Sequence, residues 1–81
     1  MNNLKRQQNE HDFDHWEDLA GGNRKYWFEV KGKTGGKARY VKTVDTHEVT
    51  ISFVQEIYDT KNELTEIHEK YPTDKGHQKI K

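Results

Sequence analysis

The chain has 81 residues, which leaves room for one domain, and its composition offers little apolar material for a core. Apolar residues make up 30% and charged residues 35%, and there is no cysteine. This excludes a disulfide-stapled fold and a cysteine-ligated metal site. No run approaches the ~20 apolar residues of a membrane-spanning helix, and the N-terminus lacks the apolar run of a signal peptide. We therefore expect a cytoplasmic protein that does not bind membranes.

The net charge of zero hides a strong segregation along the chain. Residues 9–18 hold five acids and no Lys or Arg, whereas residues 24–42 hold seven bases and one acid. Residues 45–69 then hold seven acids and one base, and residues 70–81 hold four bases and one acid. A nucleic-acid-binding protein usually has an overall basic excess, and this chain has only a basic segment.

The first part of the chain contains few signals for ordered structure. Residues 1–10 are polar and are predicted to form a disordered tail. Phe13, Trp16 and Ala20 follow at helical spacing and end at a glycine pair, so they predict a short N-terminal helical segment.

From Lys25 onward the apolar period is two, and turn residues recur at short intervals. Four such runs predict a mainly β fold, α+β at most: a four-stranded antiparallel meander, strongly curled, with a short N-terminal helical segment. Its domain would span residues 11–72, and residues 73–81 would form a polar C-terminal tail.

The predicted turns set the pairing of the strands. A three-residue loop at Lys33-Thr34-Gly35 places Phe28 opposite Tyr40, and a tight turn at Thr46-His47 places Tyr40 opposite Phe53. A Thr60-Lys61-Asn62 loop places Gln55 opposite Ile67 and Ile51 opposite Tyr71. All three choices gather one apolar face, made of Tyr26, Phe28, Val30, Tyr40, Val44, Val49, Ile51, Phe53, Ile57, Ile67 and Tyr71.

The basic segment also suggests a surface that could bind RNA. Aromatic side chains that stack bases, flanked by cations that hold phosphates, are typical of single-strand recognition on a sheet. In the predicted pairing, however, Tyr26, Phe28 and Tyr40 belong to the core and Glu29 lies beside Arg39. This leaves Trp27 as the exposed aromatic residue, and core packing with surface ion pairs is favoured over RNA binding.

Two groups of histidines have spacings that could serve metal binding or catalysis. His11 and His15 have the four-residue spacing of a metal pair on a helix, but the sequence lacks a third ligand in a recognised pattern. His68, Lys70 and His77 could supply acid, base and phosphate anchor for RNA cleavage, and a polar tail accounts for the same residues. We expect no catalytic residues, no metal and no cofactor. The candidate surface-binding residues are Trp27, Arg39, His68, Lys70 and His77.

The C-terminal run resembles the end of a group of small uncharacterised β-meander proteins. It reads Lys70-Tyr71-x-Thr73-Asp74-x-Gly76-His77, and the resemblance spans residues 53–81. The order of Thr73 and Asp74 is reversed relative to that group, and Lys75 stands where a histidine is expected. Some members are labelled toxin components of toxin–antitoxin pairs, so the resemblance implies an RNA-directed activity.

Taken together, these patterns favour a small non-enzymatic interaction domain that binds another protein or a second copy of itself. The alternative is an RNA-binding or RNA-cleaving component of a toxin–antitoxin pair.

Overall fold

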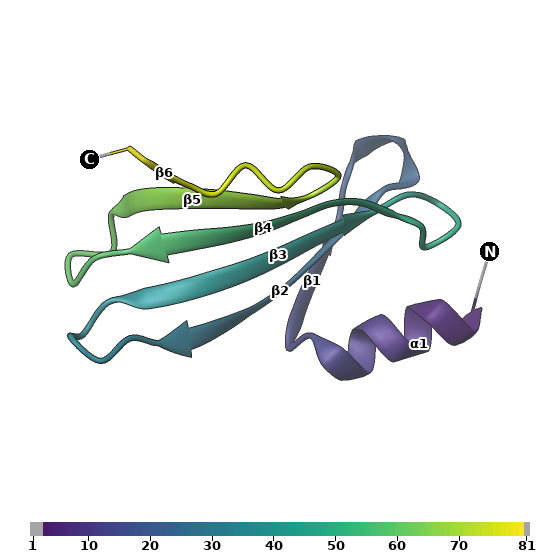
Figure 1. The fold of residues 1–81 in the computed structure, drawn as a ribbon. Coiled ribbons are helices and arrows are strands. Elements are labelled where there is room, and N and C mark those ends of the chain that lie inside the picture. Colours follow the sequence, from purple (N-terminus) through teal and green to yellow (C-terminus); the bar gives the residue numbers. More distant parts are fainter. Residues whose placement is uncertain (1–2, 81) are drawn as a thin grey trace.

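Six strands follow one another across a single antiparallel sheet, and one helix packs against one end of it (Figure 1). The computed structural model describes residues 3–80. Each strand pairs with its chain neighbours in the order β1-β2-β3-β4-β5-β6, which confirms the mainly β, antiparallel meander. The elements are α1 (Asn3–Asp12), β1 (His15–Asp18), the 3-10 turn η1 (Ala20–Gly22), β2 (Arg24–Lys31), β3 (Lys37–Val44), β4 (Thr50–Tyr58), β5 (Leu64–Tyr71) and β6 (His77–Lys79).

The prediction of four strongly curled strands is wrong, because two further strands extend the edges and the sheet stays open. β1 pairs only with β2 and β6 pairs only with β5, so the sheet does not close on itself. The predicted polar tail over residues 73–81 therefore contributes an edge strand. β6 escapes a pattern search because it is three residues long and entirely polar.

The predicted short N-terminal helical segment is confirmed, but it lies nearer the N-terminus than the spacing of Phe13, Trp16 and Ala20 indicated. The helix is α1, not residues 10–20, and it includes residues predicted to be disordered; Met1 and Asn2 lie outside the described residues. Good helix formers and the Arg6–Glu10 pair, four residues apart at 3.4 Å, favour the helix locally. Trp16 belongs instead to β1 and lies opposite Tyr26 in β2.

Three hairpin turns share one backbone geometry. In each, the first and fifth residues join through a backbone hydrogen bond: Gly32 N to Gly36 O at 2.7 Å, Asp45 N to Val49 O at 2.9 Å and Asp59 N to Glu63 O at 2.9 Å. The fourth residue takes a left-handed conformation, with φ of 94° at Gly35, 63° at Glu48 and 64° at Asn62. The three-residue loops predicted at 33–35 and 60–62 are thus confirmed, and the loop after β3 has three residues rather than two.

The longer loop changes the pairing of β3 with β4 but not the face. Tyr40 lies opposite Gln55, two residues from the predicted Phe53, because Glu48 lengthens the turn and a β-bulge interrupts the ladder near Val44. A shift of two residues keeps every side chain on its face. The rings of Phe28 and Tyr40 stack with centroids 5.0 Å apart, and those of Tyr40 and Phe53 lie 6.3 Å apart. The predicted row of three aromatic neighbours is confirmed.

The pairing of β4 with β5 is shifted by one residue, and here the predicted face is wrong. A bulge between Ile57 and Tyr58 places Ile67 opposite Glu56 instead of Gln55. This moves Ile67 to the opposite face and brings His68 opposite Gln55. A second irregularity, next to Phe53, returns Tyr71 to the face of Phe53, where it lies opposite Phe53 rather than Ile51.

The buried core is small and lies where α1 meets the sheet. Among the described residues the buried apolar side chains are Phe13, Tyr26 and Val44, with Phe28 and Phe53 packed against them. Phe13 follows α1 directly, and its ring lies 5.9 Å from that of Tyr26 and 5.5 Å from that of Phe28. The helix thus covers one end of the apolar face, and the rest of that face is left open.

Candidate functional site: an open apolar groove beside the helix

A concavity lies on the apolar face, next to the end of α1. It has a volume of about 650 Å³, and most of its lining side chains are aromatic or aliphatic. They are Asp12, Phe13, Phe28, Lys42, Val49, Thr50, Phe53 and Tyr71. We call this the apolar groove. Its size falls within the range of ligand-binding clefts.

The groove is open rather than enclosed, because the side chains at its β4 and β5 side remain exposed. Val49 is 50% exposed and Tyr71 is 46% exposed, and Ile51, next to Thr50 in the chain, is 43% exposed. Apolar side chains of this size gathered on one face mark an interaction surface more often than isolated ones do. The arrangement is suited to an apolar surface of another molecule.

A single cation stands on the wall of the groove nearest the helix. Lys42 Nζ donates a hydrogen bond of 2.8 Å to Asn9 Oδ1, and it lies 5.9 Å from the ring centroid of Phe13. Its aliphatic stem contributes to the apolar lining while its ammonium group reaches a polar partner. Lys42 therefore belongs to the contact between sheet and helix.

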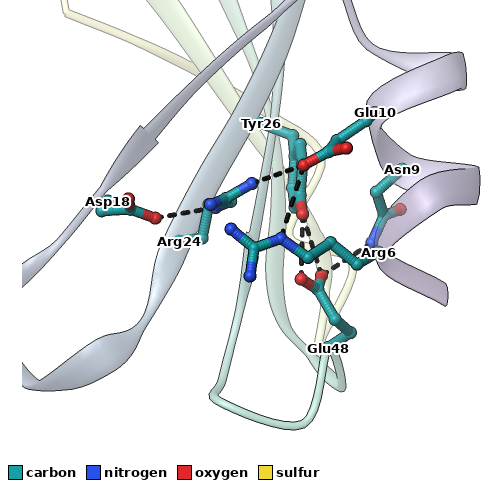
Figure 2. A network of polar contacts seen from close by, with 7 residues as sticks. All are labelled: Arg6, Asn9, Glu10, Asp18, Arg24, Tyr26 and Glu48. Carbon is teal, nitrogen blue, oxygen red and sulfur yellow. Dashed lines mark hydrogen bonds and ion pairs between the residues drawn. The ribbon is translucent and has the colours of Figure 1, made fainter. Parts of the chain in front are cut away.

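Polar side chains, not an apolar stripe, hold α1 on the sheet (Figure 2). Arg24 of β2 bridges two carboxylates, Glu10 of α1 at 2.9 Å and Asp18 of β1 at 2.7 Å. Asn9, which is buried, donates to Glu48 Oε2 at 3.1 Å. The helix fixes one wall of the groove through these contacts.

Glu48 is the centre of this network. Its carboxylate is buried and accepts hydrogen bonds of 3.0 Å from the hydroxyl of Tyr26 at both oxygens. Burial, and then the Glu48 carboxylate, raise the pKa of Tyr26 well above its usual value. Glu48 also adopts a φ of 63°, which is unfavourable for a residue with a Cβ. The network compensates for that local strain.

Two of the predicted site residues, Trp27 and Arg39, lie on the opposite face and already have partners. The ring of Trp27 stacks on His15 at 5.5 Å, and Lys25 Nζ lies 5.3 Å from its centroid. Arg39 donates two hydrogen bonds to Glu29, of 2.8 and 2.6 Å, which confirms the predicted pair. Arg39 and then Lys37 hold the pKa of the Glu29 carboxyl below its usual range.

The other three predicted residues lie on β5 and β6, on the same face as the groove. His68 lies directly opposite His77, with ring centroids 4.6 Å apart. His68 Nε2 lies 2.6 Å from Asp74 Oδ1, and its Nδ1 is buried without a hydrogen-bond partner. This contact, and then the backbone N–H of Gly76, lower the pKa of Asp74. The ring of His68 is thus held by Asp74 on one side and buried on the other.

Lys70 contacts Tyr40 rather than either of the two histidines. Its Nζ lies 5.5 Å from the ring centroid of Tyr40, whose hydroxyl accepts a hydrogen bond of 3.1 Å from Gln55. The structure therefore divides the five predicted residues into two groups on opposite faces and does not join them in one site.

No metal-binding constellation is found in residues 3–80. No three or more His, Cys, Asp or Glu side chains there are grouped in a way that could hold an ion. His11 and His15, which have the spacing of a metal pair on a helix, belong to α1 and β1 respectively and do not share a helix face.

Sequence reasoning missed Phe13, Lys42 and Glu48 as components of the site. The helical spacing predicts Phe13 inside the N-terminal helix, whereas it follows α1 directly, and the sequence predicts a turn at Glu48 without a role for its side chain. One available signal was the repeat of Asp-Thr-x-x at 45–48 and 59–62, which places Glu48 at the left-handed position that Asn62 occupies in the second copy.

Comparisons with protein families, with curated proteins and with solved structures each return no match. Within residues 3–80 the one α-helix is too short and too polar to cross a bilayer.

Proposed function

We propose that this protein is a small non-enzymatic interaction domain, and that its apolar groove binds a second copy of the same chain. The observation that carries the proposal is the open groove, flanked by exposed Val49, Ile51 and Tyr71. A single sheet must bury its apolar face against another layer, and α1 supplies that layer over one end only.

The dimensions of the chain support a partner. Its accessible surface of 5636 Å² compares with about 5100 Å² expected for a folded monomer of this mass. Its radius of gyration of 13.6 Å compares with about 12 Å for a compact chain of this length. The excess on both measures is what an unburied sheet face produces.

The shape of the surface favours a second copy as the occupant. A two-fold dimer uses the same patch on both subunits, so that patch must be complementary to itself. Here a hollow lined by Phe13, Phe28 and Phe53 lies next to exposed Val49 and Ile51, which could enter the hollow of a partner. The molecule measures 40 × 24 × 20 Å, so its broad face can supply the ~800 Å² per partner of a standard interface.

The test is the mass in solution of the full chain and of two matched variants. Ile51→Lys places a charge in the proposed contact, whereas Leu4→Lys places one at an apolar side chain of α1 that is 80% exposed and lies outside the groove. Circular dichroism establishes that each variant is folded. High salt is used so that the apolar contact is measured without charge effects.

In sedimentation equilibrium we expect the mass of two chains for the wild type and for Leu4→Lys, and of one chain for Ile51→Lys. A wild-type mass of one chain at every concentration would overturn the proposal. Equal loss of the dimer in both lysine variants would show that the groove is not its interface.

A further inference from the structure

The two outer strands of the sheet leave their outward backbone groups without a neighbouring strand. β1 and β6 lie at opposite edges (Figure 1), and all seven of their residues are exposed. An open strand edge is a template for pairing with another strand. Neither edge is part of the apolar groove, so the inference below does not rest on the proposed function.

The number of strands decides how a second copy can be placed. Six strands alternate in direction, so β1 and β6 run in opposite directions. A copy placed alongside in the same orientation brings its β1 next to β6 of the first, and the pair is antiparallel. Such a copy continues both the alternation of strands and the apolar face.

The two edges carry opposite charge. Residues 12–18, which include β1, hold four acids and no Lys or Arg, and residues 75–81, which include β6, hold three lysines and no acid. Two of these charges, Asp14 and Lys79, have no ion-pair or hydrogen-bond partner within residues 3–80. Like edges therefore repel each other, whereas β1 and β6 attract.

One register satisfies both the charges and the faces. Trp16 shares the apolar face with Tyr26, and His77 shares it with His68 and Gln55. Setting Trp16 opposite His77 in an antiparallel pair places Asp14 opposite Lys79 and Asp18 opposite Lys75 in the partner. Both charged positions are then paired with the opposite sign.

We propose that β1 of one copy pairs with β6 of another in this register, so that copies join edge to edge into one continuous sheet. The contact is heterologous, which means that an assembly of any length keeps one free β1 edge and one free β6 edge at its two ends, and the association is open-ended. Since each edge strand has only three or four residues, the contact is weak, reversible and dependent on salt.

The test uses charge reversal with rescue by mixing, followed by sedimentation velocity at low salt. Asp14→Lys and Lys79→Asp each place like charges across the proposed contact. The matched control is Lys33→Asp, which makes the same charge change at an exposed lysine in the turn between β2 and β3. All chains also carry Ile51→Lys, which removes the groove contact and leaves the edges unchanged.

We expect the average mass of the parent chain and of Lys33→Asp to rise with concentration at low salt and to return to one chain at high salt. Each edge variant alone stays at one chain. In an equimolar mixture of Asp14→Lys and Lys79→Asp, the average mass rises with concentration again. Lysine at position 14 of one variant then meets aspartate at position 79 of the other, and the remaining edges keep the native pair. A parent chain that never exceeds one chain, or a mixture that behaves like its components, would overturn the proposal.

Discussion

The buried carboxylate of Glu48 offers the sharpest test of how the helix is held. Replacing Glu48 with alanine removes the acceptor for two buried donors, the Tyr26 hydroxyl and the Asn9 amide. An unpaired buried donor costs about 1–3 kcal/mol. For two donors the cost would sum to about 2–6 kcal/mol. Because Asn9 lies on α1, which can move toward water, we expect the free energy of unfolding to fall by the lower half of that range, about 2–4 kcal/mol.

A second substitution at the same position separates the hydrogen bonds from the backbone strain. Glu48→Gly loses the same acceptor but relieves the left-handed conformation, which costs a residue with a Cβ about 1 kcal/mol. It should therefore be about 1 kcal/mol more stable than Glu48→Ala. Asn62 is the control, since it has a φ of 64° in a turn of the same geometry and is exposed. Asn62→Gly and Asn62→Ala should show the same difference without the large loss.

The assay is urea denaturation monitored by tryptophan fluorescence. The Trp16 ring lies 6.2 Å from that of Tyr26, so its emission reports on this region. If the free energy of unfolding of Glu48→Ala stays within about 0.5 kcal/mol of the wild type, the network does not stabilise the fold and the reasoning fails. A loss at Asn62→Ala as large as that at Glu48→Ala would attribute the effect to the turn alone.

Two further predictions concern tyrosine ionisation and RNA. Burial, followed by neighbouring carboxylates, raises the pKa of Tyr26 and Tyr58 above 10.0, so their contribution to stability is full below pH 10 and is lost as the pH rises above it. The absorbance of tyrosinate should therefore show a step that begins above pH 10, and Tyr26→Phe should reduce that step. A step of unchanged size in Tyr26→Phe would contradict this prediction. For RNA we expect no binding of single strands tighter than ~100 μM near physiological salt, because His15 and Lys25 already contact the Trp27 ring on which a base would stack. Micromolar binding that is lost in Trp27→Ala would reverse that conclusion and favour the RNA-directed alternative.

The part of the fold that followed from the sequence is the part fixed by local turns and alternation. Phe28 lies opposite Tyr40 and Glu29 opposite Arg39 because the Gly32–Gly36 turn has the expected three-residue loop. The prediction for Ile67 gave the wrong face, because the bulge next to Ile57 has no signal in the hydrophobic pattern. A one-residue irregularity is enough to reverse the face of a strand.

The parts that could not be predicted depend on contacts between distant residues. The helix α1 has almost no apolar face, so its position is determined by partners such as Arg24 and Glu48, far away in the chain. The apolar groove could not be located for the same reason, since Phe13, which forms its wall beside the helix, packs on Tyr26 and Phe28 of a distant strand. The proximity of His68 and His77 could not be predicted, because their pairing requires β6, which has no sequence signal.

The strictly sequential pairing of the strands has a consequence for how the chain opens and folds. No strand lies between two strands that are distant in sequence, so contacts form between neighbours and the entropy of loop closure stays small. Edge strands can detach singly while the central ladders persist. Amide hydrogen exchange should therefore be slowest in β3 and β4 and grow faster toward both edges, so that this sheet unravels from its margins inward.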